Sequence, residues 1–239
     1  ASIAAWKINR CKSFKLQPMS QFNYGADQLT AGKAIAIASG QLKAVLNRQT
    51  VARINASQQH VQQIVASGKT VYGVNTGFGI LANTAISAGD TATLQYKLLQ
   101  SHSVGVGDPL PVEVAKLMMI TKVHALAKGY SGVQLSTIGR IIWHIENNVI
   151  PVVPEKGSVG ASGDLAPLAH LFLPLIGLGK VFATDEHGST QIDTSDLLKQ
   201  KGLSAIQLGP KEGLALINGT QFILSFAVKA VQRMHNCLE

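Results

Sequence analysis

Cysteine, aromatic residues and long apolar runs are all scarce in this 239-residue sequence. The two cysteines, Cys11 and Cys237, lie at opposite ends with no paired spacing, which predicts reduced thiols and an intracellular setting. The most apolar stretch, residues 165–178, contains Pro167 and Pro174 and is shorter than the ~20 residues that a membrane helix needs. No apolar run follows the basic start, so we expect no signal peptide. These absences predict a cytoplasmic protein that does not enter a membrane.

Familiar metal-binding patterns are missing as well. Seven histidines are present, but none forms a His-Glu-x-x-His pair. The segment His144-Ile145-Glu146 lacks the Pro-Cys-x-x-Cys partner of the zinc deaminases. We therefore expect no protein-bound catalytic metal.

The positive charge of the chain is unevenly spread. The net charge is +8, yet residues 1–20 hold four basic side chains and no acidic one, so about half of the excess lies there. Aromatic residues make up only 5%, and no basic helix is interleaved with them, which argues against a nucleic-acid partner. A mildly positive remainder suits an anionic, carboxylate-bearing small molecule.

Helical periodicity dominates the sequence, and 46% hydrophobic residues can form a sizeable core. We expect a mainly α fold with an irregular arm over residues 1–25, a body over 26–208 and the start of a helical bundle over 209–239. Within the body, the pattern predicts helices over 27–40, 41–55, 56–67, 91–103 and 108–128.

The next expected helix has one apolar face made of Ile138, Ile141, Ile142 and Ile145 and ends at Pro151. We assign its Trp143 and His144 to packing and to the surface. Residues 180–207 are polar and glycine-spaced, which predicts a surface hairpin or short insertion.

The most unusual segment runs from Gly157 to Gly163 and consists of glycine, serine and alanine, apart from Val159. An apolar segment follows at once, so the backbone must turn tightly beside something buried. The nitrogen of Gly163 has no neighbouring Cβ, and a compressed loop can press it against the carbonyl carbon of Ala161. A five-membered ring then closes, and loss of two waters, one from the hydroxyl of Ser162, leaves an exocyclic methylene. Such a group is a strong electrophile, which no ordinary side chain supplies.

Two simpler interpretations of this segment compete with ring formation. A nucleophile elbow requires Gly-x-Ser-x-Gly, but the residue two positions after Ser162 is Asp164. A plain glycine turn is the commoner meaning of an isolated Ala-Ser-Gly, so only the flanking residues favour the chemistry. Asp164 itself fits either a hydrogen bond to the loop or an ordinary helix cap.

Three other segments carry candidate site residues. Residues 72–79, Tyr-Gly-Val-Asn-Thr-Gly-Phe-Gly, form a glycine-rich loop that can act as a lid. The preceding Gly68-Lys69-Thr70 is not the end of a phosphate loop, because the glycine required five positions before Gly68 is Gln63. Ser101 and His102 end a helix before another glycine turn. Asn218 follows Lys-Glu-Gly-Leu-Ala-Leu-Ile, and a polar Asn inside an apolar helix is costly without a purpose.

Together these motifs resemble the signature of the histidine and aromatic amino-acid ammonia-lyases, over nearly all of the chain from about residue 14 onward. The resemblance implies a 4-methylidene-imidazol-5-one cofactor that forms autocatalytically, with Ala161 and Gly163 cross-linked and Ser162 converted to didehydroalanine. It also implies that Tyr72 is the base and that Asn218 contacts the ring and the substrate amine. The pair Ser101-His102 is similar to the version in histidine ammonia-lyases, where the His binds the substrate imidazole.

The resemblance also implies features beyond the printed sequence. Family members continue well past residue 239, and their later helices and neighbouring subunits supply an Arg for the substrate carboxylate and a catalytic Glu. The helix after Asn218 is apolar on nearly every side, so it must be buried all round. We expect either a truncated chain with little activity alone or partners that complete the bundle, and a homotetramer at full length. Tyrosine or phenylalanine lyases, aminomutases and a non-catalytic assembly module remain alternatives.

Overall fold

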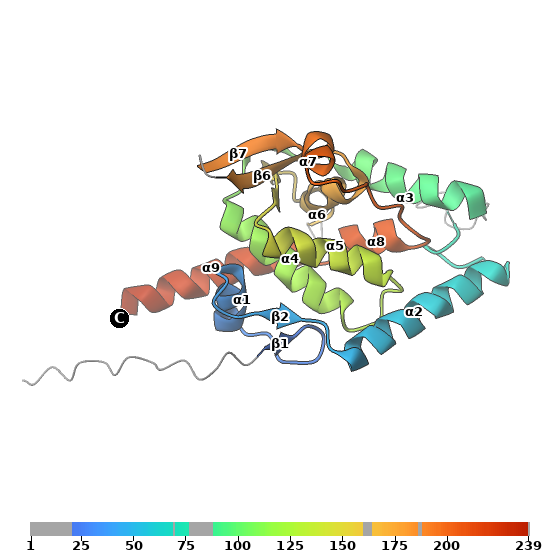
Figure 1. Ribbon diagram of the computed structural model, residues 1–239, viewed down its shortest axis with the longest axis horizontal. Helices are drawn as coiled ribbons and strands as arrows, with labels where there is room; N and C mark the ends of the chain where they lie inside the picture. The colour runs from blue at the N-terminus through green and yellow to red at the C-terminus, as the bar shows by residue number, and fades with distance from the viewer. Residues whose placement is uncertain (1–20, 69, 77–87, 160–163, 186–187, 239) are drawn as a thin grey trace, which may run out of the picture.

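The computed structural model describes residues 21–68, 70–76, 88–159, 164–185 and 188–238. Figure 1 shows helices of different lengths crossing one another, with short strands at the margins. In chain order the first half contains β1 (Phe22–Asn23), α1 (Ala31–Ala38), β2 (Ala44–Val45), α2 (Arg48–Ala66), α3 (Ala88–His102), β3 (Val106–Pro109) and α4 (Val112–Leu126). The second half contains α5 (Leu135–Glu146), β4 (Ile150–Pro151), β5 (Pro154–Lys156), α6 (Leu165–Phe172), β6 (Lys180–Asp185), β7 (Gly188–Asp193), α7 (Thr194–Gln200), α8 (Glu212–Ile217) and α9 (Gln221–Leu238). The mainly α class predicted from the sequence is confirmed.

Local capping explains where the first helices begin and end. The side chain of Thr30 accepts a hydrogen bond from the Lys33 amide at the start of α1, and Asn47 does the same for Thr50 at the start of α2. Gly40 and Gly68, both with positive φ, follow the last turns. The two helices expected over 41–55 and 56–67 are therefore one helix, and β2 occupies part of the first range. Periodicity alone missed this because the cap at Asn47 interrupts no apolar pattern.

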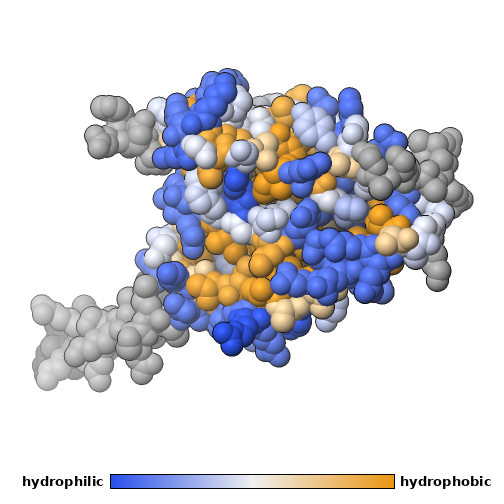
Figure 2. Space-filling view, turned by 45° about the vertical axis from the view of Figure 1, so that its right-hand side comes forward, coloured by the Kyte–Doolittle hydropathy of each residue, from blue (hydrophilic) through white to orange (hydrophobic). Residues whose placement is uncertain are grey.

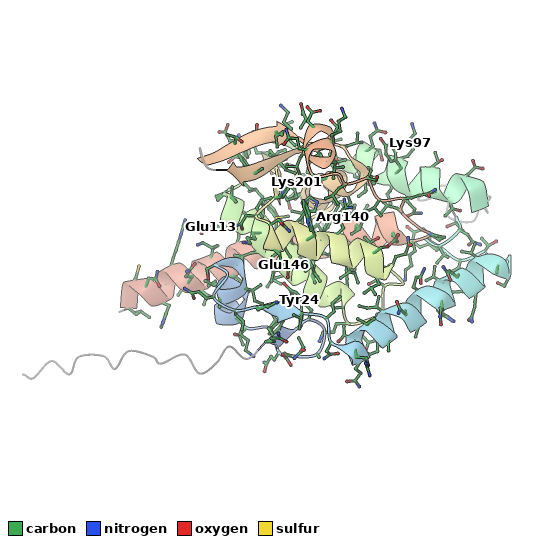
Figure 3. All side chains as sticks on the ribbon, in the orientation of Figure 1. Tyr24, Lys97, Glu113, Arg140, Glu146 and Lys201 are labelled. Carbon is green, nitrogen blue, oxygen red and sulfur yellow. The ribbon has the colours of Figure 1, made fainter. Side chains whose placement is uncertain are left out.

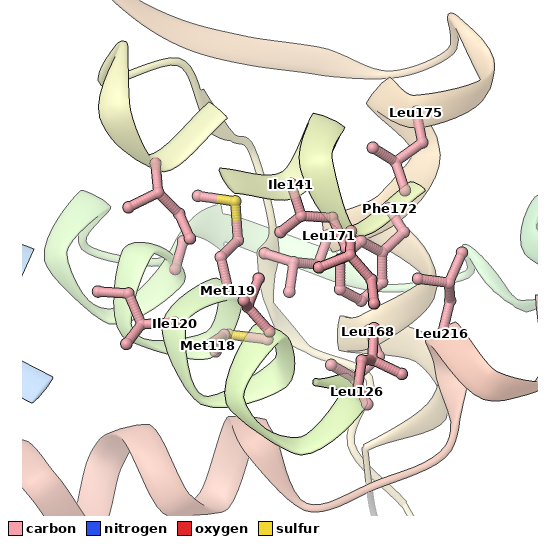
Figure 4. Close-up of a cluster of buried hydrophobic side chains, with 14 of the residues drawn as sticks. Met118, Met119, Ile120, Leu126, Ile141, Leu168, Leu171, Phe172, Leu175 and Leu216 are labelled. Carbon is pink, nitrogen blue, oxygen red and sulfur yellow. The ribbon is translucent and has the colours of Figure 1, made fainter. Parts of the chain in front are cut away.

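α4 is the centre of the core. Its buried side chains lie on all sides of the helix, and α5, α6 and α8 add theirs around it (Figure 4). The cluster includes Met118, Met119, Ile120, Ile141, Leu168, Phe172 and Leu216, each at most 1% exposed. Ile138, Ile141 and Ile145 of α5 are buried as predicted, and Ile142 packs against the same cluster.

His144 corrects an expectation. We assigned it to the surface, but it is 1% exposed, and its Nδ1 lies 2.9 Å from the carbonyl oxygen of Val149. Burial lowers the pKa of His144 to about 4. It is therefore a neutral core residue that fixes the turn after α5.

Short sheets tie the loops together. β1 pairs with β2 in parallel, β3 pairs with β5 in antiparallel fashion, and β4, β6 and β7 form an antiparallel sheet. The hairpin expected within residues 180–207 is confirmed as β6 and β7, although α7 completes the segment. The predicted start of the 108–128 helix was too early, because Asp108 and Pro109 belong to β3 and the helix begins at Val112.

α9 packs along α4 and α1 but is not enclosed. Lys229 of α9 forms an ion pair of 2.9 Å with Glu113 at the start of α4. Glu113 is labelled in Figure 3. The chain by itself does not bury this helix all round, and large apolar side chains remain exposed along it, namely Ile223, Leu224, Phe226, Val231, Met234 and Leu238. Figure 2 shows, on one face of the molecule, that apolar residues gather in patches among hydrophilic ones.

In the described part of the chain, one stretch, Glu212–Leu238, is long and apolar enough by composition to cross a membrane. This is weak evidence, because core helices of water-soluble proteins have the same properties. The stretch is also not continuous, since Asn218 is extended between α8 and α9.

Candidate active site

α8 is the common neighbour of the segments that carry the predicted site residues. Its Gly213 amide donates a 2.8 Å hydrogen bond to Oε1 of Gln95 on α3. The side chain of Leu214 lies so close to Gly73 that a Cβ there would collide with it. α8 also packs against α6, which directly follows the 161–163 tripeptide. The structure thus places the turn of Tyr72, the helix that ends at His102 and the helix after the tripeptide against α8, which itself ends just before Asn218.

Tyr72 lies in a compact turn that its own polar neighbours hold. The Val71 amide donates to Oδ1 of Asn75 at 2.9 Å, and the Gly73 amide donates to Oγ1 of Thr76 at 3.2 Å. Asn75 and Thr76 are buried, whereas the Tyr72 side chain is 58% exposed. The backbone of the turn is therefore fixed while the phenol remains accessible.

His102 is the last residue of α3 and is partly exposed. Its Nδ1 lies 2.9 Å from the carbonyl oxygen of Leu98 and 3.1 Å from Oγ of Ser101. If Nδ1 carries the proton and donates it to Leu98, Nε2 is an acceptor for an N–H group outside the helix. A hollow of about 420 Å³ lies beside this helix end, lined by Leu94, Lys97, Leu98, Gln100, Ser101 and His102.

The pairing of β3 with β5 joins the His102 segment to the segment before the tripeptide. Val106 is opposite Lys156 in this ladder. Just beyond it, Gly105 and Gly157 touch backbone to backbone: a Cβ at Gly157 would lie 2.9 Å from the Cα of Gly105. The Gly105 amide also donates a 3.0 Å hydrogen bond to Nε2 of His170 on α6. Burial lowers the pKa of His170, which favours the neutral ring that this bond requires.

Ala161, Ser162 and Gly163 lie outside the described residues, whereas the residues on both sides of them are described. On the far flank Asp164 is fully buried. Its Oδ2 accepts hydrogen bonds from the amides of Phe222 at 3.0 Å and Ile223 at 3.5 Å. Asp164 thus caps the first turn of α9, while its side chain makes no capping hydrogen bond to its own helix, α6. Burial raises the pKa of the Asp164 carboxyl, and the two amides and the charge of Lys122 oppose this rise.

Asn218 does not lie inside a helix, which corrects the sequence interpretation. α8 ends at Ile217, Asn218 is extended and exposed, and Gly219 has a φ of 141° before α9 begins. The Asn218 carbonyl oxygen accepts a 2.5 Å hydrogen bond from Nζ of Lys122. The break between the two helices therefore turns the Asn218 side chain out of the helical stack.

Glu212 fixes the other end of α8. It is fully buried, and its carboxylate accepts from the Gln134 amide at 2.8 Å, from Gln134 Nε2 at 2.6 Å and from the Gly209 amide at 2.6 Å. An acidic side chain in the first turn also matches the helix dipole.

Sequence reasoning missed Lys122, Gln95 and His170 as parts of this region. Gln95 and Lys122 are each a buried polar side chain among apolar helix neighbours, which is a readable signal. Their partners lie far away in the sequence, and no local pattern identifies them.

Comparison with known proteins agrees with this geometry. The family model described as aromatic amino acid lyase matches residues 29–239. The chain belongs to this family. Among aromatic amino acid lyases and their relatives, histidine ammonia-lyase from Caldanaerobacter subterraneus is 46% identical over 195 residues, covering 82% of this chain and 38% of that protein.

Solved structures support the same fold. Histidine ammonia-lyase from Trypanosoma cruzi matches with a TM-score of 0.78 and 36% identity, over 89% of this chain and 40% of that one. Tyrosine aminomutase from Streptomyces globisporus matches with a TM-score of 0.80 and 28% identity, over 90% and 39%. This lyase-family chain therefore spans about two fifths of the length of the relatives that it matches.

Proposed function

We propose that this chain contributes the Tyr72, His102, Ala161-Ser162-Gly163 and Asn218 part of a histidine ammonia-lyase, which converts L-histidine to urocanate and ammonia. The assignment of L-histidine as the substrate depends mainly on the Ser101-His102 pair. When Nδ1 of His102 carries the proton and donates it to the Leu98 carbonyl, Nε2 can accept the N–H of a substrate imidazole. The 46% identity to a histidine ammonia-lyase supports the same substrate.

The residues described around the tripeptide fit the cofactor that the family implies. Oδ1 of Asp164, next to Gly163 in the chain, is buried and has no hydrogen-bond partner among the described residues. It is an acceptor available to the loop during ring closure. The cofactor, formed from Ala161, Ser162 and Gly163, would supply an electrophile that makes the substrate amine a better leaving group.

The chain's own residues divide the remaining work. Removing the weakly acidic β-proton requires a positioned base, and the exposed phenol of Tyr72 on its fixed turn suits that role. His102 orients the imidazole, with Ser101 beside it, and the outward-facing Asn218 supports the ring and the amine. The bond from the β-carbon to hydrogen and the bond from the α-carbon to nitrogen break, and a carbon–carbon double bond forms.

The assembly belongs to the proposal as well. The exposed apolar side chains of α9 favour burial against further helices, and a homotetramer of the full-length enzyme would provide them. We propose a cytoplasmic location and L-histidine as the small-molecule partner. The division into an arm, a body from residue 26 and a bundle from residue 209 is likewise proposed.

The test is the intact mass of the purified chain, peptide mapping over residues 157–165, and turnover of the complete enzyme measured with histidine, tyrosine and phenylalanine. Loss of two waters within Ala161-Ser162-Gly163 is expected, and Ser162→Ala should abolish both this loss and any turnover. Ser158→Ala is the matched control and should keep both. Substantial turnover in Ser162→Ala would refute the mechanism, whereas preference for tyrosine or phenylalanine would refute histidine as the substrate.

A further inference from the structure

Lys122 is a buried lysine in the middle of the central helix α4. It is 2% exposed, between turns whose other side chains form the hydrophobic core. Burial lowers the pKa of Lys122 to about 7, and the charge of Asp164 opposes this decrease. A buried ammonium destabilises a fold unless its partners compensate for the lost water. Its partners therefore identify its role.

Those partners connect Lys122 to the two helix ends that meet between α8 and α9. Nζ of Lys122 donates to the Asn218 carbonyl at the C-terminal end of α8. Asp164, whose charge acts on Lys122, accepts from the Phe222 and Ile223 amides at the N-terminal end of α9. A cation at a helix C-terminus and an anion at a helix N-terminus are each favourable with respect to the helix dipoles.

We infer that Lys122 is a positioning residue: its terminal amino group donates to the Asn218 carbonyl and, together with Asp164, fixes the backbone of Asn218 between α8 and α9. The effect of this contact on catalysis rests on the proposed function, which assigns Asn218 to the cofactor ring and the substrate amine. The hold itself is a property of this chain alone. Gly219 allows many backbone conformations. Without Lys122, the backbone of residues 218–220 would therefore adopt several conformations, each with the Asn218 side chain in a different position.

Hydrogen exchange of individual amides tests the hold directly. In Lys122→Met, which keeps the length and removes the donor, the amides of Asn218, Phe222 and Ile223 should exchange at least tenfold faster than in the unchanged chain. Amides of the β6–β7 hairpin should keep their rates. Lys122→Arg, which retains charge and donors, should restore most of the protection.

Lys116→Met is the matched control, because Lys116 lies on the same helix but bonds to Asn148 instead. It should leave the exchange of residues 218–223 unchanged. If Lys122→Met does not fold, Lys122→Gln is measured in its place. Unchanged exchange at residues 218–223 in the folded variant would overturn the inference, as would equal acceleration in the hairpin or failure of Lys122→Arg to restore protection.

The proposed function can fail independently. Absence of both the two-water loss and turnover in the complete enzyme refutes the ammonia-lyase proposal, while the exchange experiment on this chain still decides whether Lys122 holds Asn218. In an active enzyme, the inference predicts that Lys122→Met lowers kcat at least tenfold with less than a threefold change in KM for histidine, because Asn218 acts at the reacting centre.

Discussion

Replacing Glu212 should destabilise the fold more than any ordinary change at the surface. Its buried carboxylate is the acceptor for three N–H donors from Gln134 and Gly209. A hydrogen bond to a charged group contributes about 1.5–3 kcal/mol, and a buried donor left without a partner costs a similar amount. The three bonds share one carboxylate, so their contributions do not add fully. We expect Glu212→Ala to lower the free energy of unfolding by about 3–5 kcal/mol.

Glu212→Gln removes the negative charge of the side chain but keeps its size and shape, so it separates these two contributions to stability. The amide oxygen can replace Oε2 and still accept from Gln134 Nε2 and the Gly209 amide, but the NH₂ group then faces the Gln134 amide. One bond is lost and the others weaken, which gives an expected cost of about 1–3 kcal/mol. Urea unfolding followed by far-UV circular dichroism measures both variants.

Glu155→Gln is the matched control for this experiment. Glu155 is exposed and lies 3.5 Å from exposed Lys156, so its replacement should change stability by less than about 0.5 kcal/mol. The reasoning is refuted if Glu212→Ala stays within about 1 kcal/mol of the unchanged chain, or if Glu155→Gln costs as much.

Two further predictions concern α8 and its neighbours. A Cβ at Gly213 would lie 2.9 Å from both the carbonyl oxygen and Oε1 of Gln95, so Gly213→Ala should cost about 1–3 kcal/mol, while Gly32→Ala, which meets open space in α1, should be neutral or slightly stabilising in thermal unfolding. The second concerns pH. The folded-state pKa of Lys122 is about 7, below its ordinary value of 10.5, so between these values the unfolded chain binds more protons and stability rises with pH. The slope from this group approaches ~1.4 kcal/mol per pH unit, and it should vanish in Lys122→Met when urea unfolding is compared at neutral and alkaline pH. An equal slope in both proteins would contradict the assigned pKa.

The sequence predicted those features that one segment determines by itself. The apolar spacing of Ile138, Ile141 and Ile145 identified the buried face of α5, and the polar, glycine-spaced residues after 180 identified the hairpin. The segments that carry Tyr72 and His102 contact α8, the helix that ends just before Asn218. Roles for these residues stay predictions, as does the ring at residues 161–163.

The features that sequence reasoning missed depend on contacts between distant segments. Apolar residues on every side of a helix predict burial, but they do not say which segment does the burying. Within this chain α4 has neighbours on every side, whereas apolar side chains of α9 stay exposed. His144 looked like a surface residue because its partner, the Val149 carbonyl, is a backbone atom that no side-chain pattern reveals. Asn218 was placed inside a helix because the donor that stabilises the break, Lys122, is 96 residues away.

The contact between Gly105 and Gly157 predicts that neither position accepts a side chain without moving its neighbour. A side chain at Gly157 would enter the backbone of Gly105, and one at Gly105 would press on the Lys156 carbonyl and the His170 ring. A single mutation at either position would separate the loop after His102 from the loop before Ala161, and a second mutation that adds bulk would make the separation larger. Lineages that keep both loops in place should therefore retain glycine at the two positions together, while the exposed Val159 between Gly157 and the tripeptide is free to vary.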